Sequence, residues 1–127
     1  MSYLDARTQY RRTEDGVLPD LANPHQIVLV TLRELHKSLT VLTAAHGDGQ
    51  RYPNAHVTKA LTAIYVLQSS LDFEKGGEIA DNLFRVYEFA RLQVVAAFQR
   101  DRDARLPESC SYIADILSAW EAMPKPL

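Results

Sequence analysis

The sequence predicts an all-α protein, an antiparallel up-and-down four-helix bundle with an extended N-terminal arm. Apolar residues recur in steps of three and four along four separate segments, and this spacing places them on one face of an α-helix. No segment alternates polar and apolar residues as a strand does, and no tight turn joins two such runs into a hairpin. Short connections rich in glycine, proline or charge separate the segments, and short connections favour antiparallel neighbours.

The chain length and amino-acid composition indicate one soluble domain. A chain of 127 residues with 46% hydrophobic and 24% charged residues can bury a single core. The net charge of -2 supplies no basic field to hold nucleic acid or an anionic membrane. One cysteine, Cys110, excludes an internal disulfide and a zinc site made of thiolates, so a reducing compartment is expected. The N-terminus lacks a signal peptide and no apolar run reaches the roughly 20 residues of a membrane span. We therefore expect a cytoplasmic protein with no nucleic-acid partner and no membrane insertion.

The chain divides into three expected parts. Residues 1–22 are polar, carry Gly16 and Pro19, and offer few groups for burial, so we interpret them as the N-terminal arm. Residues 23–123 hold the four periodic segments and form the expected bundle. Residues 124–127 are a short tail.

The first helix has clear boundaries in the sequence. Asn23 is a typical N-cap, Pro24 suits the first helical position, and Gln26 is placed to reach back in a capping box. The helix should end near His46, because glycines at 47 and 49 favour a turn. Its predicted core stripe is Val28, Leu32, Leu35, Leu39 and Leu42.

The other three helices follow the same logic. The second restarts after Pro53 and ends at the 72–77 turn; the third begins after Gly77, with Glu78 in its first turn, and runs to about Arg100; the fourth is opened by Pro107. The predicted core stripes are Val57, Ala60, Leu61, Ile64, Leu67 and Leu71, then Ile79, Leu83, Val86, Ala90, Val94 and Ala97, then Ser109, Ile113, Ile116 and Trp120.

No pattern in the sequence predicts catalysis. Glu34 and His36 are two residues apart and point to different faces of a helix, and no second carboxylate–histidine pair at helical spacing completes a metal site. The glycines at 76 and 77 lack the spacing of a phosphate-binding loop. Cys110 has no histidine at a helical step. We therefore expect no enzymatic activity, no cofactor and no metal.

More apolar residues are present than the core stripes use. Val30, Val41, Val66, Phe89 and Leu92 lie away from those stripes on a helical wheel. Bundle helices with two neighbours need wide apolar faces, and single exposed apolar residues are common. The alternative is a surface groove for the amphipathic helices of a partner, because contiguous apolar patches mark binding sites. The pattern alone leaves both interpretations open.

Three stretches carry a resemblance to a known family. They are Asn23-Pro24-His25-Gln26-Ile27 at the first helix start, Ala119-Trp120 near the end, and the long junction Leu71-Asp72-Phe73-Glu74-Lys75-Gly76-Gly77-Glu78-Ile79-Ala80-Asp81-Asn82-Leu83. Together they resemble the FliS family of flagellin export chaperones. Lys59-Ala60 and Tyr87 fit in register, so the resemblance extends from about Tyr10 to Met123.

The resemblance implies a function. A member of this family would bind the disordered C-terminal segment of flagellin in the cytoplasm, prevent premature polymerisation, and deliver it to a component of the flagellar type III export gate, without ATP or metal. The arm with Tyr10 would cover part of the groove or help docking at the gate. The main alternative is a regulatory adaptor bundle that binds a folded protein, and a metal or small-molecule enzyme is the third hypothesis. Whether the free protein forms a homodimer through its apolar surface is left open by the sequence.

The resemblance and the surplus apolar residues together name two sets of site residues. The residues expected to contact a partner are Tyr10, Val30, Val41, Val66, Phe84, Phe89 and Leu92. The residues of the family motifs, for which we expect structural roles, are Pro24, His25, Gln26, Gly76, Gly77, Glu78, Asn82 and Trp120.

Overall fold

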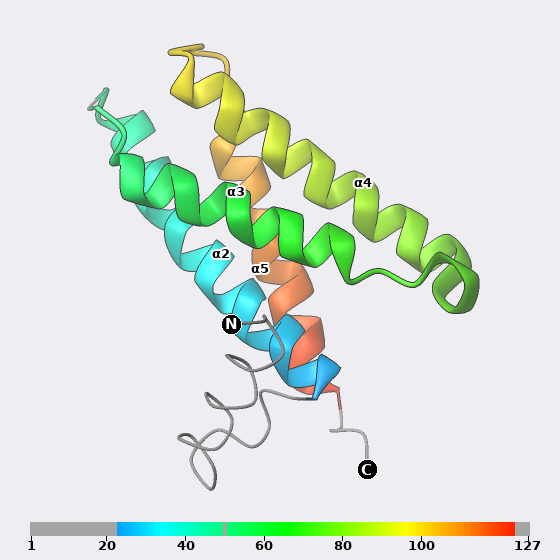
Figure 1. Cartoon of the computed structure of the whole chain (residues 1–127). Helices are drawn as coiled ribbons and strands as arrows, with labels where there is room; N and C mark the ends of the chain where they lie inside the picture. Colours follow the sequence, from blue (N-terminus) through cyan, green and yellow to red (C-terminus); the bar gives the residue numbers. More distant parts are fainter. Residues whose placement is uncertain (1–22, 50, 124–127) are drawn as a thin grey trace, which may run out of the picture.

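The computed structural model describes residues 23–49 and 51–123 (Figure 1). All regular secondary structure in these ranges is α-helical, which confirms the predicted fold class. The arm at 1–22, including Tyr10, and the tail at 124–127 lie outside the described residues. The helices are α2 (Pro24–Gly47), α3 (Asn54–Ser69), α4 (Phe73–Phe98) and α5 (Leu106–Ala122).

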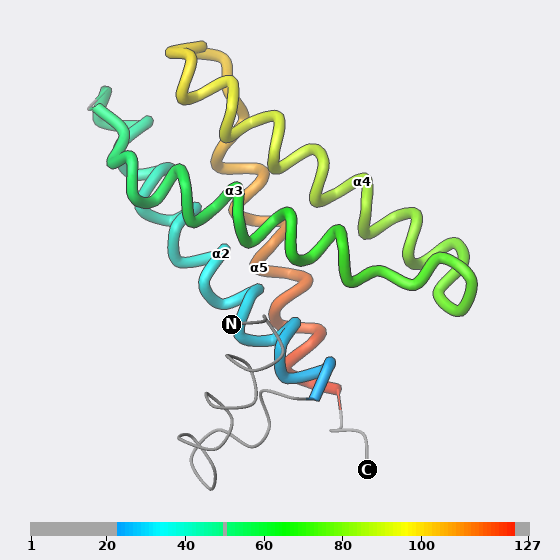
Figure 2. Tube along the Cα trace, in the orientation of Figure 1, coloured from blue at the N-terminus to red at the C-terminus, as the bar shows by residue number. Residues whose placement is uncertain are grey.

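The four helices form a closed ring in chain order. α2 packs against α3 and α5, and α4 packs against the same two helices, so α2 and α4 lie diagonally across the bundle. Each helix returns along the one before it, as the tube in Figure 2 shows. The closed end of the α3–α4 hairpin extends away from α2 and α5 (Figure 1). This arrangement is the predicted up-and-down bundle, with one end opened on the α3–α4 side.

The core is built from leucines on α2 packed against both small and large apolar residues on the other helices. Leu32, Leu35, Leu39 and Leu42 are almost completely buried, as predicted, whereas Val28 is only half-buried and Leu29 takes its place in the interior. Small side chains let helices approach closely and fill the space between large ones. The buried partners of the leucines include Ala60, Ala63, Ile64, Leu67, Tyr87, Ala90, Val94, Ala97, Leu106 and Ile113.

The start of α2 confirms one capping prediction and corrects another. The side chain of Asn23 accepts a hydrogen bond from the backbone N–H of His25 at 2.9 Å, as an N-cap should. The capping box predicted for Gln26 is wrong, because its Oε1 is buried and accepts no hydrogen bond from the described residues.

Helix α4 begins earlier than predicted, within the expected turn between α3 and α4. Helical structure starts at Phe73, because the Asp72 carboxylate accepts hydrogen bonds from the N–H groups of Glu74 and Lys75 at 3.1 and 3.0 Å. Gly77 then interrupts the helix with φ 50° and ψ -123°, a conformation that glycine adopts without strain. One helical turn therefore precedes the break, and the long straight part of α4 begins where the sequence predicted, after Gly77.

Ile79 was predicted to lie in the core, and the prediction is wrong. Its side chain is 71% exposed, while the neighbouring Ala80 is buried. Ile79 follows the break at Gly77 by two residues, at the closed end of the α3–α4 hairpin, and this end of the hairpin extends away from α2 and α5 (Figure 1). The prediction extended the apolar spacing of Leu83 back to Ile79, but this spacing carries no information on where α2 and α5 end.

The fourth helix closes the ring onto the first. Pro107 lies in its first turn, and Ser109 is fully buried with its Oγ donating to the Arg105 carbonyl at 3.1 Å. At the other end, Trp120 Nε1 donates to the His25 carbonyl at 3.0 Å, and the two rings stack with centroids 5.3 Å apart. The end of α5 is therefore fastened to the start of α2.

Candidate partner-binding surface

Large apolar side chains remain exposed along the outer edge between α3 and α4. Tyr65 of α3 is 72% exposed, and on α4 Phe84 is 38% and Leu92 is 49% exposed. Phe73 packs its ring edge-on against Phe84, with centroids 6.0 Å apart, and is itself half-exposed. We call these four residues the α3–α4 seam. Exposed apolar groups that gather on a soluble protein mark a surface for a partner.

A hydrogen bond between α3 and α4 indicates that Tyr65, Phe84 and Leu92 lie on one side of the bundle. Gln68 of α3 donates from Nε2 to Glu88 of α4 at 3.1 Å, so the outer flanks of the two helices meet there. Phe84 and Leu92 lie four residues before and after Glu88, and Tyr65 lies three residues before Gln68. Residues three or four apart on a helix are neighbours on its surface. The seam therefore surrounds the Gln68–Glu88 contact.

The polar centre of the seam is satisfied internally. Arg91 donates to the Glu88 carboxylate from Nε at 2.8 Å and from Nη2 at 2.5 Å. The hydrogen bonds from Arg91, and then from Gln68, lower the pKa of Glu88 to about 2, so this carboxylate is ionised at neutral pH. Because these groups already have partners, we expect the apolar side chains around them to dominate what the seam can bind.

A second group of predicted contact residues lies on α2 and α3. The side chain of Val30 is 36% exposed, and those of Val41 and Val66 are half-buried. Ser38 of α2 lies 3.2 Å from Nδ1 of His56 of α3, which fixes the register of the two antiparallel helices. Val30 lies eight residues before Ser38, and Val66 lies ten residues after His56. At a rise of about 1.5 Å per residue, the two valines therefore lie within about one helical turn of the same level on the antiparallel α2–α3 pair.

Phe89 belongs to neither group. Its ring lies 5.7 Å from that of Tyr112 on α5, and the guanidinium of Arg105 lies over it, 5.0 Å from the centroid. The side chain is half-buried between α4 and α5. The structure thus distributes the candidate residues over several helix pairs and does not gather them in one groove.

Several exposed aromatic residues were missed by sequence reasoning. Tyr65, Phe73 and Tyr112 were not among the predicted contact residues, although each is exposed. Tyr65 lies between the buried Ile64 and the half-buried Val66, so its position off the core stripe was visible on a helical wheel. Phe73 could not have been placed, because the helical turn that carries it was not predicted.

Metal-ligand groups and membrane-spanning helices are two further features that could indicate a function for the described residues. Within 23–49 and 51–123, no group of three or more histidine, cysteine and acidic side chains could hold a metal ion. None of the described helices combines the length and the apolar character needed to cross a bilayer. Cys110 is half-buried, with its sulfur 3.6 Å from Oγ1 of Thr40.

Comparison with known proteins shows the family. The model of the family described as "Flagellar protein FliS" matches residues 6–126, which is nearly the whole chain. The chain belongs to the FliS family. This result confirms the resemblance based on the three motifs.

Curated relatives of this chain carry a functional name. The flagellar secretion chaperone FliS of Vibrio cholerae is 33% identical over 104 residues, covering 81% of this chain and 76% of the relative. The flagellar secretion chaperone FliSB of Pseudomonas aeruginosa is 28% identical over 127 residues, covering 97% and 98%. The FliS of Salmonella typhimurium is 30% identical over 103 residues, covering 79% and 76%. No solved structure matches the chain.

The motif residues of this chain lie at the end of the bundle opposite the α2–α3 and α4–α5 connections (Figure 1). Pro24 and His25 lie in the first turn of α2, and the His25 ring stacks on Trp120 near the end of α5. Gly76 lies close against Ala80, because a Cβ added to it would come within 2.9 Å of the Ala80 Cβ. The remaining motif residues, Glu78 and Asn82, are exposed on the first turns after Gly77. That the whole set is structural, and does not contact cargo, stays a prediction.

Proposed function

We propose that this FliS-family protein is a cytoplasmic export chaperone for flagellin. It binds the disordered C-terminal segment of flagellin, prevents premature polymerisation, and delivers the cargo to the flagellar type III export apparatus, with no catalysis and no cofactor. The family membership and the chaperone names of the relatives support this function. The observation that carries it is the exposure of large apolar side chains on a small helical domain, above all at the α3–α4 seam.

The positions of the candidate residues favour an extended cargo. Val30 and Val66 lie on the α2–α3 pair, while Phe84 and Leu92 lie on α4, which is diagonal to α2. A compact partner covers one side of a small bundle, whereas a disordered segment can wrap several sides at once. The segment loses conformational entropy when it becomes ordered, and this cost limits affinity and allows later release at the export gate.

The regulatory adaptor remains the second candidate function. The α3–α4 seam by itself could hold a folded partner, because Tyr65, Phe84 and Leu92 lie within about one helical turn of the same interhelical contact and Phe73 packs against Phe84. Under this alternative the α2–α3 residues would take no part in binding. The two functions therefore differ in how many sides of the bundle a partner covers.

Titration with cargo tests the proposed function. The full-length chain is mixed with a synthetic flagellin C-terminal peptide, and binding is followed by calorimetry and by far-ultraviolet circular dichroism. We expect saturable binding and a gain in helical signal beyond the sum of the two components, because the segment orders on the apolar surface. A scrambled peptide of the same composition is the control. Absence of binding by the native sequence would reject the proposal.

Two matched pairs of variants separate the chaperone from the adaptor. Val30→Ser with Val66→Ser alters the α2–α3 side, and Phe84→Ser with Leu92→Ser alters the α3–α4 side. A wrapping cargo predicts weaker peptide binding for both pairs. Loss with the α4 pair alone, together with capture of a folded partner, would favour the adaptor.

A further inference from the structure

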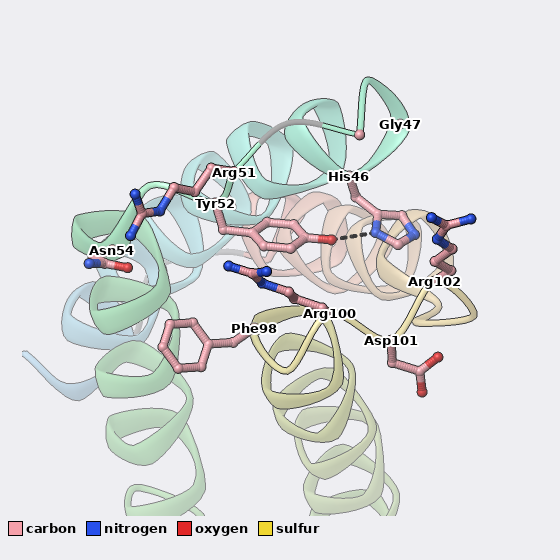
Figure 3. Close-up of a pocket in the computed structure, with 10 residues that line it drawn as sticks. His46, Gly47, Arg51, Tyr52, Asn54, Phe98, Arg100, Asp101 and Arg102 are labelled. Atoms are coloured by element: carbon pink, nitrogen blue, oxygen red, sulfur yellow. Dashed lines mark hydrogen bonds between the residues drawn. The ribbon is translucent and has the colours of Figure 1, made fainter.

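A pocket of about 900 Å³ lies at the end of the bundle where the α2–α3 and α4–α5 connections meet (Figure 3). The end of α2 contributes His46, the following connection contributes Arg51 and Tyr52, and the end of α4 contributes Phe98. Arg100 lines it from the loop after α4. The pocket is far larger than a single small anion requires and falls in the size range of sites for larger ligands.

Two stacked rings form a fixed wall of this pocket. The hydroxyl of Tyr52 lies 2.5 Å from Nδ1 of His46, and the two rings are nearly parallel with centroids 6.1 Å apart. Burial raises the pKa of Tyr52, so its hydroxyl keeps its proton well above neutral pH. The hydrogen bond therefore holds the α2–α3 connection against the end of α2.

The charges around the wall are not balanced. Arg51, Arg100 and Arg102 line the pocket, and none of them forms an ion pair with any described residue. The one acidic residue in the lining, Asp101, uses a carboxylate oxygen to accept from the Asp103 N–H at 2.9 Å. The lining therefore carries three positive charges and one negative charge, and an anionic ligand would offset the excess of positive charge.

The backbone at Arg100 adds a second observation. Its φ is 67°, the left-handed region, and it is the one residue other than glycine with a positive φ in the described part of the chain. This conformation ends α4: the Asp101 N–H donates to the Ala96 carbonyl and the Arg100 N–H to the Ala97 carbonyl, each at 2.9 Å. The turn at Arg100 therefore directs the chain from the end of α4 into the loop that lines the pocket.

One side of the pocket is suited to bind an anion, and Phe98 next to it offers an apolar surface. In Figure 3, Arg51 and Arg100 extend toward the side where Asn54 and Phe98 lie, while Arg102 lies beyond His46 on the other side of the ring pair. Asn54 begins α3, so the partial positive charge of a helix N-terminus adds to that side. Phe98 is 55% exposed and offers an aromatic face next to the charges.

We propose that this pocket binds an acidic peptide segment of a partner protein. A carboxylate lies between Arg51 and Arg100, an apolar or aromatic side chain of the peptide covers Phe98, and a second carboxylate reaches Arg102. Arginine suits carboxylates because its planar guanidinium can donate two parallel hydrogen bonds. Carboxylates along a peptide are spaced apart, as these arginines are, whereas the phosphates of a nucleotide concentrate their charge at one place. The site is additional to the flagellin-binding surface and does not depend on it.

Fluorescence anisotropy with designed probes tests the proposal on the full chain. The probe is a fluorescein-labelled peptide with blocked ends and the sequence Glu-Asp-Trp-Glu-Asp, and its neutral match is Gln-Asn-Trp-Gln-Asn. We expect saturable binding of the acidic probe, weaker by about tenfold or more for the neutral one because the charge-assisted hydrogen bonds are lost. Added salt should weaken the acidic probe only. Equal binding of both probes, or none, overturns the proposal.

Two double variants locate the binding. Arg51→Gln with Arg100→Gln should weaken the acidic probe by about tenfold or more, while Arg33→Gln with Arg85→Gln removes the same charge elsewhere and should change it by less than about twofold. Thermal melts confirm that each variant is folded. Equal losses in the two pairs would mean a general charge effect and would overturn the site. Displacement of the probe by ATP at lower concentration than by unlabelled peptide would make the pocket a phosphate site and would also overturn it.

Discussion

Replacing Phe84 and Leu92 by serine is the most direct perturbation of the proposed cargo surface. Both side chains belong to the α3–α4 seam and both are partly exposed in the free protein, at 38% and 49%. The exposed part is what a cargo segment can still remove from water. The buried part already contributes to the stability of the bundle. The double variant therefore has two separate effects that can be estimated from the structure.

The effect on binding follows from the exposed fractions. Complete burial of a leucine or phenylalanine side chain contributes about 1.5 to 3 kcal/mol. If cargo covers the remaining 38% and 49%, each residue adds about 1 kcal/mol, so the pair adds about 2 kcal/mol. A loss of that size raises the dissociation constant roughly thirtyfold.

The effect on folding must be smaller than the stability of the domain. The buried half of each side chain is also lost, at a cost of about 1 kcal/mol per residue, which a domain with about 5 kcal/mol or more of stability tolerates. A thermal melt checks that the variant is folded at the temperature of the binding assay. Arg85→Ser, an exposed substitution beside Phe84, is the matched control.

Calorimetric titration with the flagellin C-terminal peptide measures the predicted change. The double variant should bind roughly thirtyfold more weakly, by the area argument above, and the control should match the parent chain. A folded double variant with an unchanged dissociation constant would refute the assignment of the seam to cargo. An equal loss in Arg85→Ser would show that the effect is not one of apolar burial.

Four further predictions concern the fold. Leu35→Ala should lower the free energy of unfolding by about 2 to 5 kcal/mol in a urea titration, since the side chain is completely buried; a change below about 1 kcal/mol would contradict its central place. Gly77→Ala should cost about 1 kcal/mol or more, because φ is positive there, and an unchanged melt would argue against that turn. Glu88→Gln should cost about 0.5 kcal/mol at pH 7, a small effect because solvent screens the Glu88–Arg91 pair. The pKa of Glu88 is lowered to about 2, so this contribution is present above the unfolded pKa and should fade from about pH 4 downward as pH approaches 2; a difference from the parent that stays constant with pH would contradict it. Burial raises the pKa of Tyr87 to about 12, so an ultraviolet titration should show this tyrosine ionising last, and its stabilising contribution, complete below pH 10, should be lost as pH rises toward 12; ionisation near pH 10 in the folded state would refute its burial.

Local sequence determined most of the secondary structure and the α2 side of the core. The stripe from Leu32 to Leu42 is buried as predicted, because its spacing already matches one face of a helix. The Asn23 cap and the break at Gly77 were also predictable from the sequence. The Asn23 side chain hydrogen-bonds to the backbone two residues later, and glycine at 77 permits the positive φ angle, so neither depends on a distant part of the chain. The family resemblance was also readable, because its longest motif is one continuous stretch of chain.

Tertiary structure decided what the helices leave uncovered. Ile79 has the spacing of a core residue but is 71% exposed. Phe89 was predicted to be a contact residue, and its side chain is half-buried against Tyr112. The pocket joins Arg51 and Arg100, which are distant in sequence and meet because two loops end at the same level. Helical periodicity indicates which residues share a face of a helix. Whether that face is exposed, and which charged residues come together, depends on how far each neighbouring helix extends. The lengths and packing of the neighbouring helices are set only in the folded bundle.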